Sequence, residues 1–144
     1  MDAEAVTRLR RVIGRLARLF NASSASEDLS PTQASVLGLV AHRGPLGLAE
    51  LTEIEGLNPS MVSRVVAKLD GEGLVRRLPD PADQRAARLE ATDAGRRTHK
   101  RILAARTATV AKILEDLSPD VSDALVEALP ALEALAEGLR STRR

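Results

Sequence analysis

The stretch from Asn58 to Leu78, NPSMVSRVVAKLDGEGLVRRL, has the pattern of a helix followed by a short strand. Asn58 is a favourable N-cap, and Pro59 suits the first position of a helix. On a wheel of 3.6 residues per turn, one face is apolar and carries Val62, Val65, Val66 and Leu69. Two glycines then end the helix. The stretch therefore predicts a helix with one buried face, followed by a strand over residues 74–78.

Two further helices are expected directly before this one. Ser30 and Gln33 have the spacing of a capping box, with proline at the first helical position, so a helix is expected to begin there. The pair Gly44-Pro45 ends that helix, and the glycine suits a left-handed cap. Residues 48–55 predict a short third helix, whose inward side chains are Leu48, Leu51 and Ile54.

The segment after the first strand has the pattern of a hairpin and two long helices. A polar loop with two prolines leads to a second strand, Ala87 to Ala91. Thr92 is then expected to cap a long helix that ends near residue 117. Ser118-Pro119 starts the last helix, which Pro130 should kink or split.

The first and last helices carry heptad-like apolar seams. The N-terminal helix, residues 4–20, places Val6, Leu9, Ile13, Leu16 and Phe20 on one seam. The last helix repeats the pattern with Val121, Leu125, Leu132, Leu135 and Leu139. Such seams favour dimerisation between two copies, although each could instead pack on the core of its own domain.

The order of the elements predicts a mainly α fold, a winged helix-turn-helix with the order α-α-α-α-β-β-α-α. We expect a single domain over residues 1–144, with a winged lobe over about 30–92 and dimerisation helices over about 4–20 and 92–140. In this fold one helix enters the major groove of duplex DNA. The exposed face of the helix after Asn58 supplies the candidate contacts, which are Ser60, Met61, Ser63, Arg64 and Lys68. The alternative is an amphipathic surface helix without a partner.

Five segments of the chain resemble the MarR family of bacterial regulators. They are GPLGLAEL from Gly44, NPSMVSRVVAKL from Asn58, GLVRR from Gly73, DPADQR from Asp80 and TDAG from Thr92. The resemblance runs over essentially the whole chain, including the terminal helices. Its most specific part is the Asp-x-Arg of Asp83 and Arg85, because it lies between two short strands that follow a helix-turn-helix.

The resemblance implies that Arg85 sits at the wing and enters the minor groove, and that Asp83 orients it through an ion pair. An arginine suits that groove because the potential there is strongly negative. A local salt bridge that shapes the hairpin is the alternative, and both roles are compatible. Arg77 and Arg88 flank the wing and are candidate phosphate contacts.

Family members commonly bind small aromatic effectors between the dimerisation helices and the DNA-binding lobe, so a small-molecule effector is a candidate partner. The chain departs from the family in two respects. The chain has one Phe, no Trp and no Tyr, so a pocket would be lined by aliphatic residues and arginine. Ala91 stands where a leucine usually precedes the threonine, which loosens the packing under the wing.

Composition excludes several other classes of function. The chain has no cysteine and two histidines that are far apart in sequence, so we expect no metal site and no cofactor. No phosphate-binding loop or nucleophile motif indicates an enzyme, and no catalytic residue is assigned. The near absence of aromatic residues disfavours a stacking platform for single-stranded nucleic acid. No apolar run is long enough to span a membrane and no signal peptide is recognised, which predicts a cytoplasmic, nucleoid-associated protein.

Charge is unevenly distributed along the chain. Residues 91–112 carry a net charge of +5 and residues 113–139 carry −7, although the whole chain has a net charge of +1. A basic segment beside an acidic one fits a molecule with one face for polyanions. We therefore expect a regulator, more specifically a repressor, that binds a palindromic operator in duplex DNA as a homodimer. The alternative is a winged helix that binds another protein and no DNA.

Overall fold

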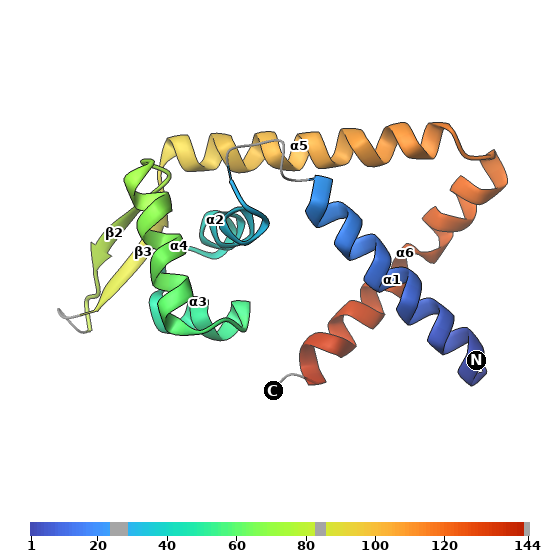
Figure 1. The fold of residues 1–144 in the computed structure, drawn as a ribbon, viewed down its shortest axis with the longest axis horizontal. Helices are drawn as coiled ribbons and strands as arrows, with labels where there is room; N and C mark the ends of the chain where they lie inside the picture. Colours follow the sequence, from blue (N-terminus) through green and yellow to red (C-terminus); the bar gives the residue numbers. More distant parts are fainter. Residues whose placement is uncertain (24–28, 83–85, 143–144) are drawn as a thin grey trace. The chain divides into compact units, whose positions relative to one another are not determined.

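The computed structural model describes residues 1–23, 29–82 and 86–142, and within them the predicted mainly helical winged fold is confirmed (Figure 1). The chain divides into two compact units, Met1–Arg106 and Thr107–Arg144. The elements in chain order are α1 Ala3–Ser23, α2 Pro31–Arg43, β1 Leu46–Gly47, α3 Leu48–Glu55, α4 Pro59–Gly71, β2 Val75–Pro79, β3 Ala87–Ala91, α5 Asp93–Glu115 and α6 Pro119–Thr142.

Local capping interactions explain where α2 and α5 begin. Ser30 Oγ accepts a hydrogen bond from the Gln33 amide at 3.2 Å, and Gln33 Oε1 accepts one from the Ser30 amide at 3.0 Å, which confirms the capping box. Thr92 Oγ1 accepts a hydrogen bond from the Gly95 amide at 3.0 Å and so caps α5. These starts were predictable because each depends on residues within one turn of the helix.

The core of the first unit lies between α2, α3, α4 and the small sheet, which Figure 1 shows grouped together. The apolar face predicted for α4 is buried in it, and Val62 and Leu69 have no exposed surface. The other large side chains that are fully buried in this core come from α2, α3, β2, β3 and α4 itself: Val36, Leu37, Val40, Leu51, Val66, Val75 and Leu89. One face of α4 is therefore held against the lobe, and its opposite face is left to solvent.

The sheet has three antiparallel strands in the order β1-β3-β2, one strand more than the sequence predicted. The additional strand is β1, which pairs Leu46 with Leu89 and Gly47 with Arg88. β2 and β3 form the expected hairpin, in which Val75 pairs with Ala91. A strand of two residues has no periodicity to detect, and its existence depends on a partner more than forty positions away.

Gly44 ends α2 as predicted, but the expected left-handed cap is wrong. Its backbone is extended, with φ −62° and ψ 159°, a conformation open to any residue. Glycine is required here for space, because a Cβ would overlap the carbonyl oxygen of Val40. That same carbonyl accepts the Gly44 amide at 2.8 Å.

The prediction that Ile54 points inward is also wrong, since the side chain is 42% exposed. Leu51 is fully buried and Leu48 packs against the core, as predicted. One turn after Leu51, the half-buried position belongs to Glu55, whose Oε1 accepts a hydrogen bond from the Ser35 hydroxyl at 2.9 Å. A polar contact between α3 and α2 thus replaces the apolar contact expected from Ile54.

The remaining differences from the predicted elements concern helix and strand ends. α1 continues to Ser23, α5 ends at Glu115, and β2 begins one residue later than expected. The last helix is not split, because α6 runs through Pro130. Proline removes the amide that would bond to the Val126 carbonyl. Val126 is 62% exposed, so water can satisfy that carbonyl and the helix tolerates the proline.

The hairpin is joined to α5 by close backbone contacts at Leu74. The Leu74 carbonyl accepts the Thr92 amide at 3.1 Å, and the Thr92 hydroxyl donates to the Gly73 carbonyl at 2.6 Å. Gly95, in the first turn of α5, is buried against the same Leu74 carbonyl, and a Cβ at this position would overlap it. The junction therefore requires glycine at position 95.

Gly95→Ala should destabilise the protein by about 2 kcal/mol or more, because the added methyl group meets rigid backbone rather than a side chain that can move. The control is Gly71→Ala at the end of α4, where a Cβ has nothing within 4 Å. That control should match the wild type or be up to about 1 kcal/mol more stable. Urea denaturation measures both, and equal stability of the two variants would contradict this account of the junction.

His99 packs α5 against α2 in the first unit. A Cβ at Gly38 of α2 would lie 2.9 Å from His99 Cε1, so the imidazole occupies the space that this glycine leaves. Burial lowers the pKa of His99 below its ordinary value of 6.5, and the positive charges of Arg106 and His42 lower it further.

The lowered pKa of His99 predicts that acid destabilises the fold. The unfolded chain protonates His99 near pH 6.5, whereas the folded chain resists protonation, so the free energy of unfolding falls as the pH drops through 6.5 and levels off below the folded pKa. Above pH 6.5 the group contributes no pH dependence. His99→Gln should reduce the loss of stability between about pH 7.5 and pH 5.5 in urea titrations. An unchanged loss in that variant would show that other groups cause it.

Candidate nucleic-acid interface

The first turn of α4 is fixed by its N-cap. Asn58 has extended backbone angles, and its Oδ1 accepts the Met61 amide at 2.8 Å. The hydroxyl of Ser60 donates to the same oxygen, also at 2.8 Å. The Asn58 side chain thus caps the helix and also accepts a hydrogen bond from the exposed side chain of Ser60.

All five side chains predicted to contact DNA from α4 lie on its exposed side: Ser60, Met61, Ser63, Arg64 and Lys68. Lys68 forms an ion pair with Glu72 at 3.2 Å, and both side chains are well exposed, so water and salt screen the pair. In the part of the chain that the structure describes, no ion pair involves Arg64. Its charge is therefore available to an external anion.

The two arginines predicted to flank the wing already have partners within the lobe. Arg77, on β2, lies 3.6 Å from Asp70 at the end of α4. Arg88, on β3, donates to the Pro45 carbonyl at 3.0 Å and so ties β3 to the segment before β1. The first contact is weak and exposed, so Arg77 can exchange it for a phosphate more easily than Arg88 can leave a backbone carbonyl.

The loop between β2 and β3 is closed at its base. Asp80 Oδ1 accepts the Ala82 amide at 2.9 Å, and the Asp80 amide donates to the Ala86 carbonyl at 3.3 Å. The predicted pair of Asp83 and Arg85 lies outside the described residues.

An ion pair across the hairpin was not predicted. Arg76 Nε lies 2.7 Å from Glu90 Oε2, and the two residues are direct partners in the register of β2 and β3. The predicted strands, 74–78 and 87–91, would have placed Arg76 opposite Leu89 if paired end to end. In the structure β2 begins one residue later, and the opposite charges that then face one another across the antiparallel pair stabilise that register.

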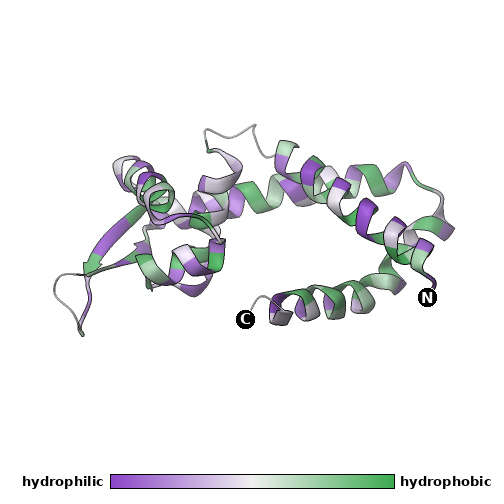
Figure 2. Ribbon diagram, turned by 60° about the horizontal axis from the view of Figure 1, so that its bottom comes forward, coloured by the Kyte–Doolittle hydropathy of each residue, from purple (hydrophilic) through white to green (hydrophobic). Residues whose placement is uncertain are grey.

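The seam residues of the terminal helices remain largely uncovered within one chain. On α1, Leu9 and Ile13 are half-buried, whereas Val6, Leu16 and Phe20 are exposed. In α6, where every residue from 119 to 142 is described, no side chain is buried. Figure 2 shows apolar residues recurring along the whole of this helix. Its seam residues, all exposed, are Val121, Leu125, Leu132, Leu135 and Leu139.

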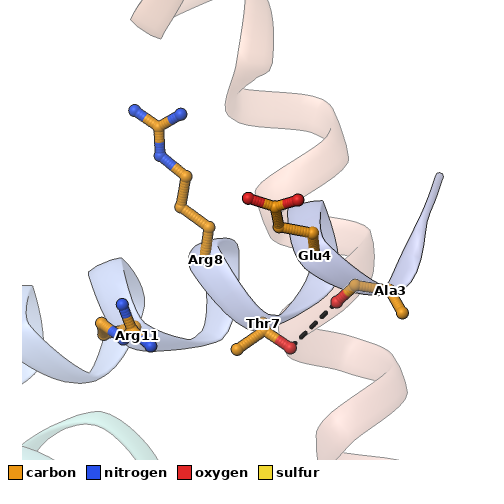
Figure 3. Close-up of a pocket in the computed structure, with 5 residues that line it drawn as sticks. All are labelled: Ala3, Glu4, Thr7, Arg8 and Arg11. Carbon is orange, nitrogen blue, oxygen red and sulfur yellow. Dashed lines mark hydrogen bonds between the residues drawn. The ribbon is translucent and has the colours of Figure 1, made fainter.

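A surface pocket of about 460 Å³ lies along the first turns of α1 (Figure 3). It is lined by Ala3, Glu4, Thr7, Arg8 and Arg11, and the Thr7 hydroxyl donates to the Ala3 carbonyl at 2.9 Å. Its lining comes from a single helix and combines the apolar Ala3 with polar and charged side chains, two of them arginines.

The described ranges contain neither a metal-binding cluster nor a membrane-spanning helix. Among residues 1–23, 29–82 and 86–142, no group of His, Asp and Glu side chains could hold a metal ion. No helix in those ranges is both long and apolar enough to cross a bilayer.

Comparisons with known proteins agree with the geometry of the lobe. The model of the MarR family matches residues 29–87. An uncharacterised HTH-type transcriptional regulator of Mycobacterium bovis is 29% identical over 136 residues, which cover 94% of this chain and 95% of that protein. Transcriptional regulator Tm0710 of Thermotoga maritima is structurally similar, with a TM-score of 0.76, 25% identity and coverage of 94% and 98%. FabT of Streptococcus pneumoniae, solved in complex with DNA, has the same fold with a TM-score of 0.68, 17% identity and coverage of 96% and 99%.

Proposed function

Because this chain belongs to the MarR family of DNA-binding transcriptional regulators, we propose that it is a repressor that binds a palindromic operator as a homodimer. The observation that carries the proposal is the exposed face of α4. It presents two serines and an arginine without an ion pair, while the opposite face is buried in the lobe. An α-helix fits the major groove, and its N-terminal half presents side chains to the base edges.

The residues of α4 divide into two roles in this proposal. Ser60, Met61 and Ser63 lie in the first turns and are short enough, or flexible enough, to approach base edges closely. Arg64 is one turn further on and reaches guanine edges or phosphate. Lys68, near the end of the helix, contacts the DNA backbone and sets the position of the helix.

The wing provides a second contact in the adjacent minor groove. We assign Arg85 to the groove and Asp83 to its orientation, as the family resemblance implies. Arg77 is the better candidate for a phosphate contact, because its exposed pair with Asp70 is easily exchanged. Arg88 is assigned to the same role only secondarily, since its guanidinium is bonded to the Pro45 carbonyl.

The terminal helices supply the dimer contacts in this proposal. A helix of 24 residues with an apolar seam and no buried side chain exposes surface that a second copy can cover. The winged lobe, over about 30–92, is then presented twice, and the helices over about 4–20 and 92–140 hold the two copies together. Two lobes related by a two-fold axis read a palindrome with half-sites about one helical turn apart.

Repression follows from occupancy of the operator, which excludes other proteins from the same duplex. Relief of repression by a small ligand stays a prediction from the family resemblance. The pocket on α1 is a candidate location, and Arg8 and Arg11 in its lining favour an anionic ligand.

The function is tested by selecting bound fragments from genomic DNA with the purified protein and placing a recovered operator before a reporter gene. A palindromic fragment that the protein binds, and a reporter whose expression rises when the protein is absent, support repression. Failure to enrich any fragment, with normal folding, would favour a winged helix that binds another protein.

Arg64→Ala and Arg85→Ala should each weaken binding to the recovered operator by about 1–3 kcal/mol, because each loses a contact inside a groove. Arg140→Ala is the matched control, since it removes the same charge from α6, where Arg140 pairs with Glu137. Fluorescence anisotropy at several salt concentrations measures these affinities, and wild-type binding should weaken steeply with salt. If the folded Arg64 and Arg85 variants bound as the control does, the recognition helix and wing assignments would both fail.

Leu132→Glu should disrupt the dimer, because it places a carboxylate within the apolar seam of α6 in both copies. Ala134→Glu is the control, since it adds the same side chain on the opposite side of the helix wheel. Sedimentation equilibrium should give a dissociation constant at least about tenfold higher for the first variant, which corresponds to about 1.4 kcal/mol. A dimer that tolerates Leu132→Glu as well as the control would rule out this seam as the interface.

A further inference from the structure

The hydroxyl of Ser60 has a fixed hydrogen-bonding direction. Asn58 Oδ1 accepts the Met61 amide at 2.8 Å, and this contact requires the oxygen of the side-chain amide, because a backbone N–H can only donate. Ser60 Oγ lies 2.8 Å from the same Oδ1. A carbonyl oxygen carries no hydrogen, so the proton in this second contact must come from the serine.

The exposed part of Ser60 can therefore act only as an acceptor while the cap is intact. A serine hydroxyl has one proton and two lone pairs. The proton is used within the protein, and the lone pairs remain for an external donor. Serine in general reads a base as either donor or acceptor, so this cap removes one of its two choices.

Ser63 provides the contrast on the same face of α4. It is exposed, and no hydrogen bond of its hydroxyl occurs among the described residues. Its proton can turn toward whichever base edge it meets. The two serines are chemically identical, and their different surroundings give them different recognition properties.

We propose that Ser60 is a specificity-determining residue that accepts a hydrogen bond from an exocyclic amino group of the operator, the N6 of adenine or the N4 of cytosine. This inference rests on the proposed function. A base acceptor, such as N7 or O6 of guanine, could bind Ser60 only if the hydroxyl left Asn58, so one hydrogen bond would replace another. An amino group adds a hydrogen bond without removing one. Each base pair presents one such amino group in the major groove, on its adenine or its cytosine. Ser60 therefore favours base pairs in which that base lies on the strand nearest to its hydroxyl.

The test uses the operator that wild-type protein selects from a random duplex library, together with synthetic duplexes altered at one base in one of the two half-sites. Purine in place of adenine, or 2-pyrimidinone in place of cytosine, removes the amino group. A 7-deazapurine removes the N7 acceptor instead. Each duplex is titrated with wild type, Ser60→Ala, Ser60→Thr and Ser63→Ala, after thermal melting confirms that each variant is folded.

At one position of the half-site, removal of the amino group should weaken binding of the wild type and Ser60→Thr about 3- to 10-fold more than it weakens binding of Ser60→Ala. Ser63→Ala should lose affinity by the same factor as the wild type when the amino group at that position is removed, whatever its own affinity for the unaltered operator. Removal of N7 should affect the wild type and Ser60→Ala equally at every position. The inference is overturned if no position shows the coupling to the amino group, or if Ser60 couples to N7. Selection of no duplex by wild type would instead overturn the proposed function.

Discussion

Burial of one face of α4 determines what its other face can present. Val62 and Leu69 have no exposed surface and Val66 has almost none, so rotation of the helix about its axis would bring apolar side chains into water. Full burial of each such side chain is favourable by roughly 1.5–3 kcal/mol, so even a partial rotation would be strongly unfavourable. The recognition residues need no interaction of their own to hold the helix in this orientation.

The cap at Asn58 adds a second constraint, at the end of the helix where bases would be read. Core packing fixes the direction of the helix and the face that is exposed, but it does not set the direction of an exposed hydroxyl. The bond from Ser60 to Asn58 does so with a single contact. At the other end of the lobe, the junction of Leu74, Thr92 and Gly95 joins the hairpin to α5 through backbone contacts. The elements of the lobe that would meet DNA are therefore supported by short-range polar contacts around an apolar core.

The sequence predicted those features that depend on neighbouring residues. The capping box at Ser30, the cap at Thr92 and the buried face of α4 all follow from patterns within a few turns. β1 did not, because it exists only through pairing with β3. The prediction that Ile54 points inward was wrong for a related reason. Periodicity assigned the contact with α2 to this apolar residue, whereas a hydrogen bond between Ser35 and Glu55 makes that contact.

The candidate site shows the same limit. Periodicity placed Ser60, Ser63 and Arg64 on one exposed face, as the structure has them. It could not distinguish the two serines, because the difference lies in a hydrogen bond to the cap residue. It also could not indicate that Arg77 and Arg88 have partners. The contact of Arg77 depends on how the chain turns between α4 and β2, and the contact of Arg88 joins positions 43 residues apart.

Dimerisation and base selection reinforce one another in the proposed function. A single acceptor at Ser60 gives modest discrimination at one base pair, because one neutral hydrogen bond contributes only about 0.5–1.5 kcal/mol. A two-fold symmetric pair of lobes applies the same selection at both half-sites, so the free energies add and the discrimination factors multiply. A factor of about 3 to 10 for each half-site becomes about 10 to 100 for the palindrome. The apolar seam of α6 thus bears on specificity as well as on assembly, because a lobe that acted alone would have only the smaller factor.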